Sequence, residues 1–208
     1  MGLNTRLFRQ QVSQRLVKQG GSMVDDAIKK NFEEKKAEFL EAFDDHEVTK
    51  ELQAASTNPM MGSSFIPKGN LFSLIGFDNG DKPTDGLRNY LNKSIKLNLK
   101  QKRLKIENGK IVIETPVQIP TLDDLDKARE VVSATPDWVS GRSWITLLQK
   151  GITGFGQFVA TLLASPDPSR SGGGLQHKGL NPQLSGSVGP IKYVNQLLAE
   201  FKASLKSK

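Results

Sequence analysis

RLKIENGKIVIE, residues 103–114, is the stretch that decides the fold class. An Asn-Gly pair in its middle supplies the positive φ angles of a type I′ turn, and alternating apolar residues flank that pair. The resulting register places Ile106 opposite Ile111 and Leu104 opposite Ile113. Because side chains alternate between the two faces of a strand, this stretch predicts a β-hairpin with one apolar face.

The segment before the hairpin is predicted to extend the sheet. Ile95, Leu97 and Leu99 alternate with polar residues, and a reversal near 101–102 would bring them beside the first hairpin strand. We therefore expect an α+β fold with a three-stranded antiparallel meander over about 94–118. Helices must cover its apolar face, because a small bare sheet is only marginally stable in water.

Apolar spacing predicts two helices before this sheet. The first covers about 3–19 and ends at a pair of glycines, and the second runs from Ser22 to about residue 55. We interpret residues 1–22 as an N-terminal helical extension of a single domain, residues 1–208.

Further helices are predicted around and after the sheet. Leu87, Tyr90, Leu91 and Ile95 have helical spacing, and Thr121 is a helix N-cap. A short buried helix is expected at Trp144–Leu148 with Gly151 as its stop, and Trp138 is expected to join it; a last helix is expected to start at Pro190. The short apolar runs 71–77 and 155–164 fit either a strand or a helix.

The composition excludes several classes of protein. The 208 residues include no cysteine, which rules out disulfides, thiolate metal sites and a cysteine nucleophile. We find neither an apolar leader at the start nor an apolar run of membrane-spanning length, and expect no membrane association. The net charge of +7 allows acidic partners such as nucleic acid, but it also fits an ordinary basic surface.

The search for a catalytic site is negative. The sequence contains no GxSxG elbow, no HExxH and no GxGxxG motif, and its two histidines, His46 and His177, are far apart. The acidic run around His46 lies in a predicted helix, where adjacent side chains point in different directions and cannot converge on one metal ion. We expect no enzymatic activity, no cofactor and no metal.

A group of basic residues is predicted on the outer face of the sheet. They are Lys96, Lys100, Lys102, Arg103, Lys105 and Lys110. Such a face could contact the phosphates of DNA without reading its sequence. Aromatic residues that stack on bases are missing from these strands, and lysines also protect sheet edges from pairing.

The segment 165–190, SPDPSRSGGGLQHKGLNPQLSGSVGP, is rich in glycine and proline. It lacks the GxxxxGK[ST] motif of a phosphate-binding loop, and its glycines are not followed directly by a predicted helix. Structureless connections of this length are uncommon within a domain unless they are functional. We predict an arm that contacts other subunits through Arg170, Gly172, Gly173, Gly174, His177 and Lys178.

The order of these elements resembles that of the small neck and tail-completion proteins of tailed bacteriophages. The resemblance covers residues 24–120 and the final helix, and includes a segment similar to a Thr-Gly-x-Leu-Arg-x-x-Ile pattern that leads into the sheet. Asp85 interrupts the pattern, and its final isoleucine lies further along. The matching residues are Thr84, Gly86, Leu87, Arg88 and Ile95.

This resemblance implies a virion structural protein at the head–tail junction, as a connector, tail-completion or tail terminator protein. The expected partners are further copies in a homo-oligomeric ring and other phage neck or tail proteins. It would be assembled in the host cytoplasm and end in the virion, with non-specific contact to packaged DNA at most. The alternative is a non-specific nucleic-acid-binding protein that uses the basic β-face.

Overall fold

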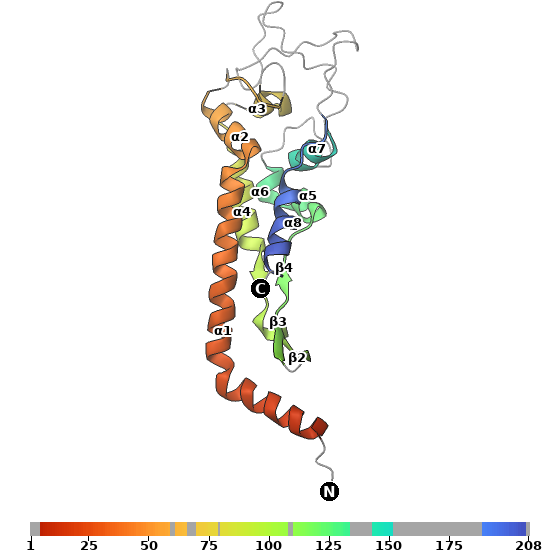
Figure 1. Ribbon diagram of the computed structural model, residues 1–208. Coiled ribbons are helices and arrows are strands. Elements are labelled where there is room, and N and C mark those ends of the chain that lie inside the picture. The colour runs from red at the N-terminus through yellow and green to blue at the C-terminus, as the bar shows by residue number, and fades with distance from the viewer. Residues whose placement is uncertain are drawn as a thin grey trace, which may run out of the picture.

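A computed structural model gives the fold of most of the chain. It describes residues 5–58, 61–65, 70–78, 80–107, 110–133, 143–151 and 189–206. The fold is mostly helical with small antiparallel β-pairings, which confirms the predicted fold class. Figure 1 shows one long helix along the side of the molecule, with the shorter elements packed against it.

The long helix is α1, Thr5–Asp45, and it is followed by α2, Glu47–Thr57. The prediction that the glycine pair at 20–21 ends a helix is wrong, since α1 continues through it. Glycine costs about 1 kcal/mol in a helix but does not break the hydrogen-bond ladder as proline does. The break comes instead at His46, whose extended backbone (φ −61°, ψ 137°) ends the helix that we expected to reach residue 55.

Shorter helices follow α1 and α2 along the chain. They are α3 (Leu71–Ile75), α4 (Pro83–Ser94), α5 (Leu122–Lys127), α6 (Arg129–Val132), α7 (Trp144–Lys150) and α8 (Val194–Ser204). The segment at 71–77, left open by its sequence, is helical at α3 and ends at Gly76 in the left-handed conformation (φ 86°). The predicted N-cap Thr121 is confirmed, because its side chain accepts from the backbone N–H of Asp124 in a capping box.

The sheet region consists of two separate antiparallel pairs. The hairpin strands β2 (Arg103–Glu107) and β3 (Lys110–Glu114) have the predicted register, with Leu104 opposite Ile113 and Ile106 opposite Ile111. The other pair joins β1 (Lys96–Leu97) to β4 (Val117–Gln118). The Asn-Gly turn itself lies outside the described residues.

The predicted three-stranded meander is therefore wrong. Leu97 faces Val117 across the β1–β4 pair and has no partner in β2. The 3₁₀ turn η1 (Leu99–Gln101) occupies the place of the expected reversal, so β1 continues toward the hairpin instead of folding back on it. Pro116 lies between the two pairs on the other side; its carbonyl accepts from the backbone N–H of Asn98 at 2.9 Å, but it has no N–H with which to return that bond.

The core lies between α1 and the remaining helices. Phe39 of α1 and Phe201 of α8 pack with ring centroids 5.0 Å apart. Tyr193, just before α8, contacts both Phe43 and Trp144, at centroid distances of 5.8 and 6.4 Å. Aromatic side chains from both ends of the chain thus form one core, which fixes the C-terminal helix against the N-terminal one.

The start of the last helix differs from the prediction. We expected Pro190 at its first position, but α8 begins at Val194 with Tyr193 as its N-cap. Ile191 is held instead by a 2.8 Å backbone hydrogen bond to the carbonyl of Leu148 in α7. One face of α8 is buried, since the side chains of Val194, Leu197, Leu198 and Phe201 are at most 5% exposed. The predictions for Trp138, for 155–164 and for the arm at 165–188 lie outside the described residues.

Candidate functional site

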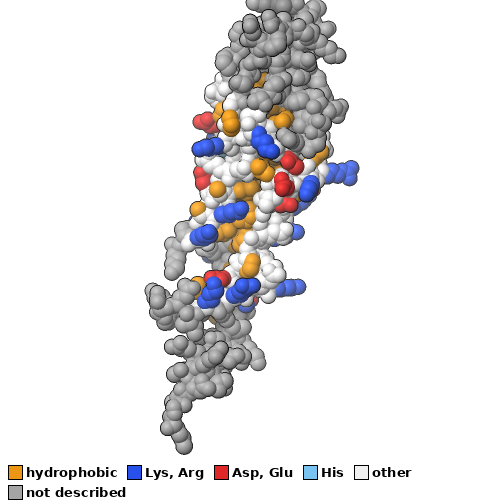
Figure 2. Space-filling model, turned by 90° about the vertical axis from the view of Figure 1, so that its right-hand side faces the viewer, with side chains coloured by type: hydrophobic (Ala, Val, Ile, Leu, Met, Phe, Trp, Pro, Cys, Tyr) orange, Lys and Arg blue, Asp and Glu red, His pale blue; other side chains and the backbone are white. Residues whose placement is uncertain are grey.

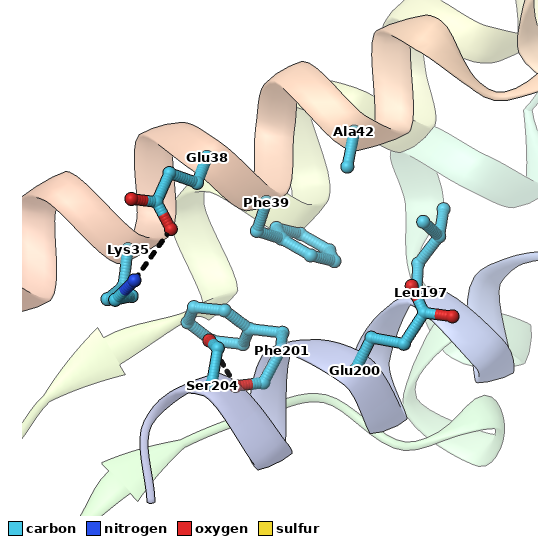
Figure 3. Close-up of a pocket in the computed structure, with 8 residues that line it drawn as sticks. All are labelled: Lys35, Glu38, Phe39, Ala42, Leu197, Glu200, Phe201 and Ser204. Carbon is cyan, nitrogen blue, oxygen red and sulfur yellow. Dashed lines mark hydrogen bonds and ion pairs between the residues drawn. The ribbon is translucent and has the colours of Figure 1, made fainter. Parts of the chain in front are cut away.

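The α1–α8 contact contains a shallow hollow of about 150 Å³. Figure 3 shows Phe39 and Phe201 facing one another at its centre, with Glu38 and Glu200 at its rim. Glu38 accepts from Lys35 at 2.8 Å, and Glu200 accepts from Gln196 at 2.9 Å. No nucleophile–base pair lies among its eight lining residues, so this hollow is a helix–helix seam.

The segment that carried the phage resemblance is a packing element. Thr84, Leu87 and Ile95 are at most 2% exposed. A Cβ atom at Gly86 would lie 2.3 Å from the carbonyl oxygen of Glu130 in α6, so glycine is what allows α4 and α6 to approach this closely. Arg88 donates from Nε to both carboxylate oxygens of Asp44, at 2.8 and 2.9 Å, and so links α4 to α1. These five residues position the helix that leads into the sheet.

The predicted basic face is divided among several elements. Lys96, Lys100 and Arg103 are exposed and belong to β1, η1 and β2 respectively. Figure 2 shows Lys and Arg side chains at separate places along the body, interspersed with apolar and uncharged groups.

Two of the predicted lysines have acidic partners. Lys102 is only half-exposed and pairs with Asp25 of α1 at 2.5 Å, and Lys105 pairs with Glu114 of β3 at 2.6 Å. The side chain of Lys110 lies outside the described ones. The set is therefore less available to phosphates than its sequence suggests.

An open groove of about 430 Å³, which we call the basic groove, lies between α1, α4 and β1. Its apolar lining comes from Phe32, Ile95, Leu97 and Leu99, and Glu33 is its acidic member. Its cationic lining consists of Lys29, Lys36, Lys93 and Lys96. Three of these lysines are exposed, whereas Lys36 is half-buried and donates to the backbone carbonyl of Asn92 at 2.6 Å. This groove can receive an anionic partner that also has apolar or uncharged surface.

A polar cluster surrounds the break between α1 and α2. The Tyr193 hydroxyl is 2.7 Å from the hydroxyl of Thr49, and both residues are fully buried. Burial raises the pKa of the Tyr193 phenol well above its ordinary value. The imidazole of His46 packs on the Tyr193 ring at a centroid distance of 4.8 Å, and its Nδ1 accepts from the backbone N–H of Val48 at 3.2 Å.

The role of this cluster is to stabilise the fold at the start of α2. Burial lowers the pKa of His46, against the opposing influence of Glu47 and Glu200, and so favours the neutral imidazole that can cap α2.

Two carboxylates hold loops in a similar way. Glu51 is 6% exposed and accepts from the Ser63 hydroxyl at 2.8 Å and from the backbone N–H of Leu71 at 2.7 Å. Asp126 accepts from the backbone and hydroxyl of Ser143 and from the Thr146 hydroxyl. Burial opposes the ionisation of Asp126, but these hydrogen bonds outweigh it and lower its pKa. Both carboxylates fix the starts of short helices.

Within the described ranges, no three histidine or acidic side chains gather as metal ligands would. Among the helices of the described part, none has the length and apolar content that crossing a membrane requires. The predicted arm residues, from Arg170 to Lys178, lie outside the described residues, and their contact with other subunits stays a prediction.

Comparison of the chain with protein-family models, with curated proteins and with solved structures finds no match in any of the three.

The basic groove was missed by the sequence reasoning. It joins residues 29–36 to residues 92–99, which are about sixty positions apart and meet only when α1 packs against α4. The local signal is the group of lysines on α1, which by sequence alone looks the same as an ordinary solvated helix face.

Proposed function

We propose that the protein is a structural component of a tailed-phage virion that forms part of a ring at the head–tail junction. The supporting observation is the order of elements: a long N-terminal helix, α4 leading directly into β1, two small antiparallel β-pairs, and a short C-terminal helix that packs against α1. This is the order of elements on which the sequence resemblance rests. The position within the neck, as connector, tail-completion or tail terminator protein, stays open.

The shape of α1 favours a role in assembly. Figure 1 shows α1 running past the β2–β3 hairpin and bending, so that its first turns lie beyond the body formed by the other helices. Most helices in proteins owe their stability to the packing of one face against other elements rather than to helix propensity alone. Contact with other subunits would provide such packing for the extension at residues 5–22.

The alternative, a nucleic-acid-binding protein, receives less support. Its proposed surface includes Lys102 and Lys105, whose charges are compensated by Asp25 and Glu114. Binding of DNA through this surface would fall steeply with salt and be lost on charge reversal of Lys96, Lys100 and Arg103.

Immunogold electron microscopy of purified virus particles tests the proposal. An antibody against this chain should label the junction between capsid and tail at one site per particle. Absence of the chain from purified particles, while it is abundant in the infected-cell lysate, would overturn the proposal.

A further inference from the structure

We infer that the basic groove between α1, α4 and β1 binds an acidic stripe on α1 of a second copy of the chain. This inference rests on the proposed function, since it names the contact by which neighbouring copies in the ring would meet. The acidic stripe is defined as Glu34, Glu38, Glu41 and Asp45.

The acidic stripe forms one face of α1. Its members are spaced four, three and four residues apart, which places them on one side of a helix. All four are exposed, and the side chains of Glu34, Glu38 and Asp45 are 60%, 61% and 68% exposed. Their ion pairs within the chain are with exposed or half-exposed lysines, which stabilise little. The carboxylates of the stripe are therefore available for stronger ion pairs with another chain.

The charge distribution favours a second copy of the chain as the partner that binds the groove. Residues 25–47 contain nine acids and four lysines, a net charge of −5, whereas the whole chain has a net charge of +7. Two copies repel one another on average, so an approach is favourable only where an acidic face of one meets a basic face of the other. The groove supplies the basic face through Lys29, Lys93 and Lys96.

The two faces lie on nearly opposite sides of the molecule's long helix. Groove residues on α1 and the acidic stripe are separated by about 160° around the helix axis at 3.6 residues per turn. A chain can therefore present its stripe to one neighbour while its groove accepts the stripe of another. Such a head-to-tail contact repeats from copy to copy and closes into a ring when the rotation allows it.

Nucleic acid fits the groove less well. Phe32 is its aromatic residue and is 4% exposed, so its ring cannot stack on a base. Glu33 also lines the groove and would repel a phosphate backbone. An acidic helix with uncharged residues between its carboxylates matches both the lysines and the apolar side chains of the groove.

Charge reversal in complementary pairs tests the inference. A groove variant carries Lys29→Glu and Lys96→Glu, and a stripe variant carries Glu34→Lys and Glu41→Lys. All four residues are exposed, so folding should be retained, and circular dichroism would verify it. The control variant carries Lys82→Glu and Lys127→Glu, which are exposed residues outside both faces and change the net charge as the groove variant does.

Native mass spectrometry of each full-length variant gives the outcome. We expect the wild type and the control to assemble, and the groove and stripe variants each to fall to the mass of one chain, 22.9 kDa. An equimolar mixture of the two variants should assemble again, because each reversed face then meets an opposite charge. Loss of assembly in both variants without recovery in the mixture would overturn the inference.

Other results separate this inference from the proposed function. If the wild type assembles and both variants keep its mass, the stripe–groove contact is wrong while the ring proposal stands. A wild type that remains a single chain at every concentration overturns both. If the groove variant keeps its mass but no longer binds a fluorescent single-stranded oligonucleotide that the wild type binds, the groove is a nucleic-acid site instead.

Discussion

Replacing Gly86 by alanine tests the packing of the segment that leads into the sheet. The new Cβ atom would lie 2.3 Å from the carbonyl oxygen of Glu130, whereas Cβ contacts below 3.0 Å are essentially never seen, so α4 and α6 must move apart by at least about 0.7 Å. Such overpacking costs about 1–3 kcal/mol, and the better helix propensity of alanine returns up to about 1 kcal/mol. We expect a net loss of about 1–2 kcal/mol.

Urea denaturation followed by circular dichroism measures this change in the free energy of unfolding. A thermal scan should show a fall in Tm of about 2–8 °C for a chain of this size. Gly62→Ala is the matched control, because no heavy atom beyond its two chain neighbours lies within 4 Å of its Cβ position, and it should be neutral or slightly stabilising. A G86A variant as stable as the wild type would refute the close approach of α4 and α6.

Three further predictions concern other parts of the chain. Burial lowers the pKa of His46 below its ordinary 6.5, so as the pH falls the unfolded chain binds a proton at His46 at a higher pH than the folded chain does. The contribution of His46 to the free energy of unfolding should therefore be present at pH 7 and decrease below about pH 6.5. His46→Asn, which can still cap α2, should reduce that fall in urea titrations at pH 7 and pH 5, and an unchanged fall would contradict this role. Tyr193→Phe should lower the free energy of unfolding by about 1–2 kcal/mol, because it leaves the Thr49 hydroxyl buried without its partner. Adding Thr49→Val should recover most of this loss, and no recovery in the double variant would assign the loss to packing. Deletion of residues 169–179 should leave the circular dichroism spectrum unchanged but block assembly, and limited proteolysis should cut this segment in the free chain and spare it in the assembled form; equal protection in both forms would contradict an interface arm.

The elements that the sequence predicts well are those set by local spacing. The periodic apolar residues of α4 and α7, the N-cap at Thr121 and the register around the Asn-Gly pair depend on neighbours within a few positions. Two features of α1 were missed. Glycine usually ends helices, but the pair at 20–21 is tolerated inside α1, and His46 breaks the helix although histidine is an uncommon N-cap.

Sequence patterns do not predict contacts between distant segments. Leu97 alternates correctly for a strand, but its spacing cannot tell whether it pairs with β2 or with Val117. The ion pair of Lys102 joins residues 77 positions apart, and the Thr49–Tyr193 hydrogen bond joins residues 144 positions apart. For the same reason the groove could not be anticipated, although every lysine in it was visible in the sequence.

The most direct test of the proposed ring is the mass of the purified protein in solution, measured by sedimentation equilibrium over a wide range of concentrations. A closed ring predicts a single species above a threshold concentration, with a mass that is a whole multiple of 22.9 kDa and does not grow as more protein is added. A mass that increases without limit would show an open filament. A mass of 22.9 kDa at every concentration would contradict self-assembly of this chain.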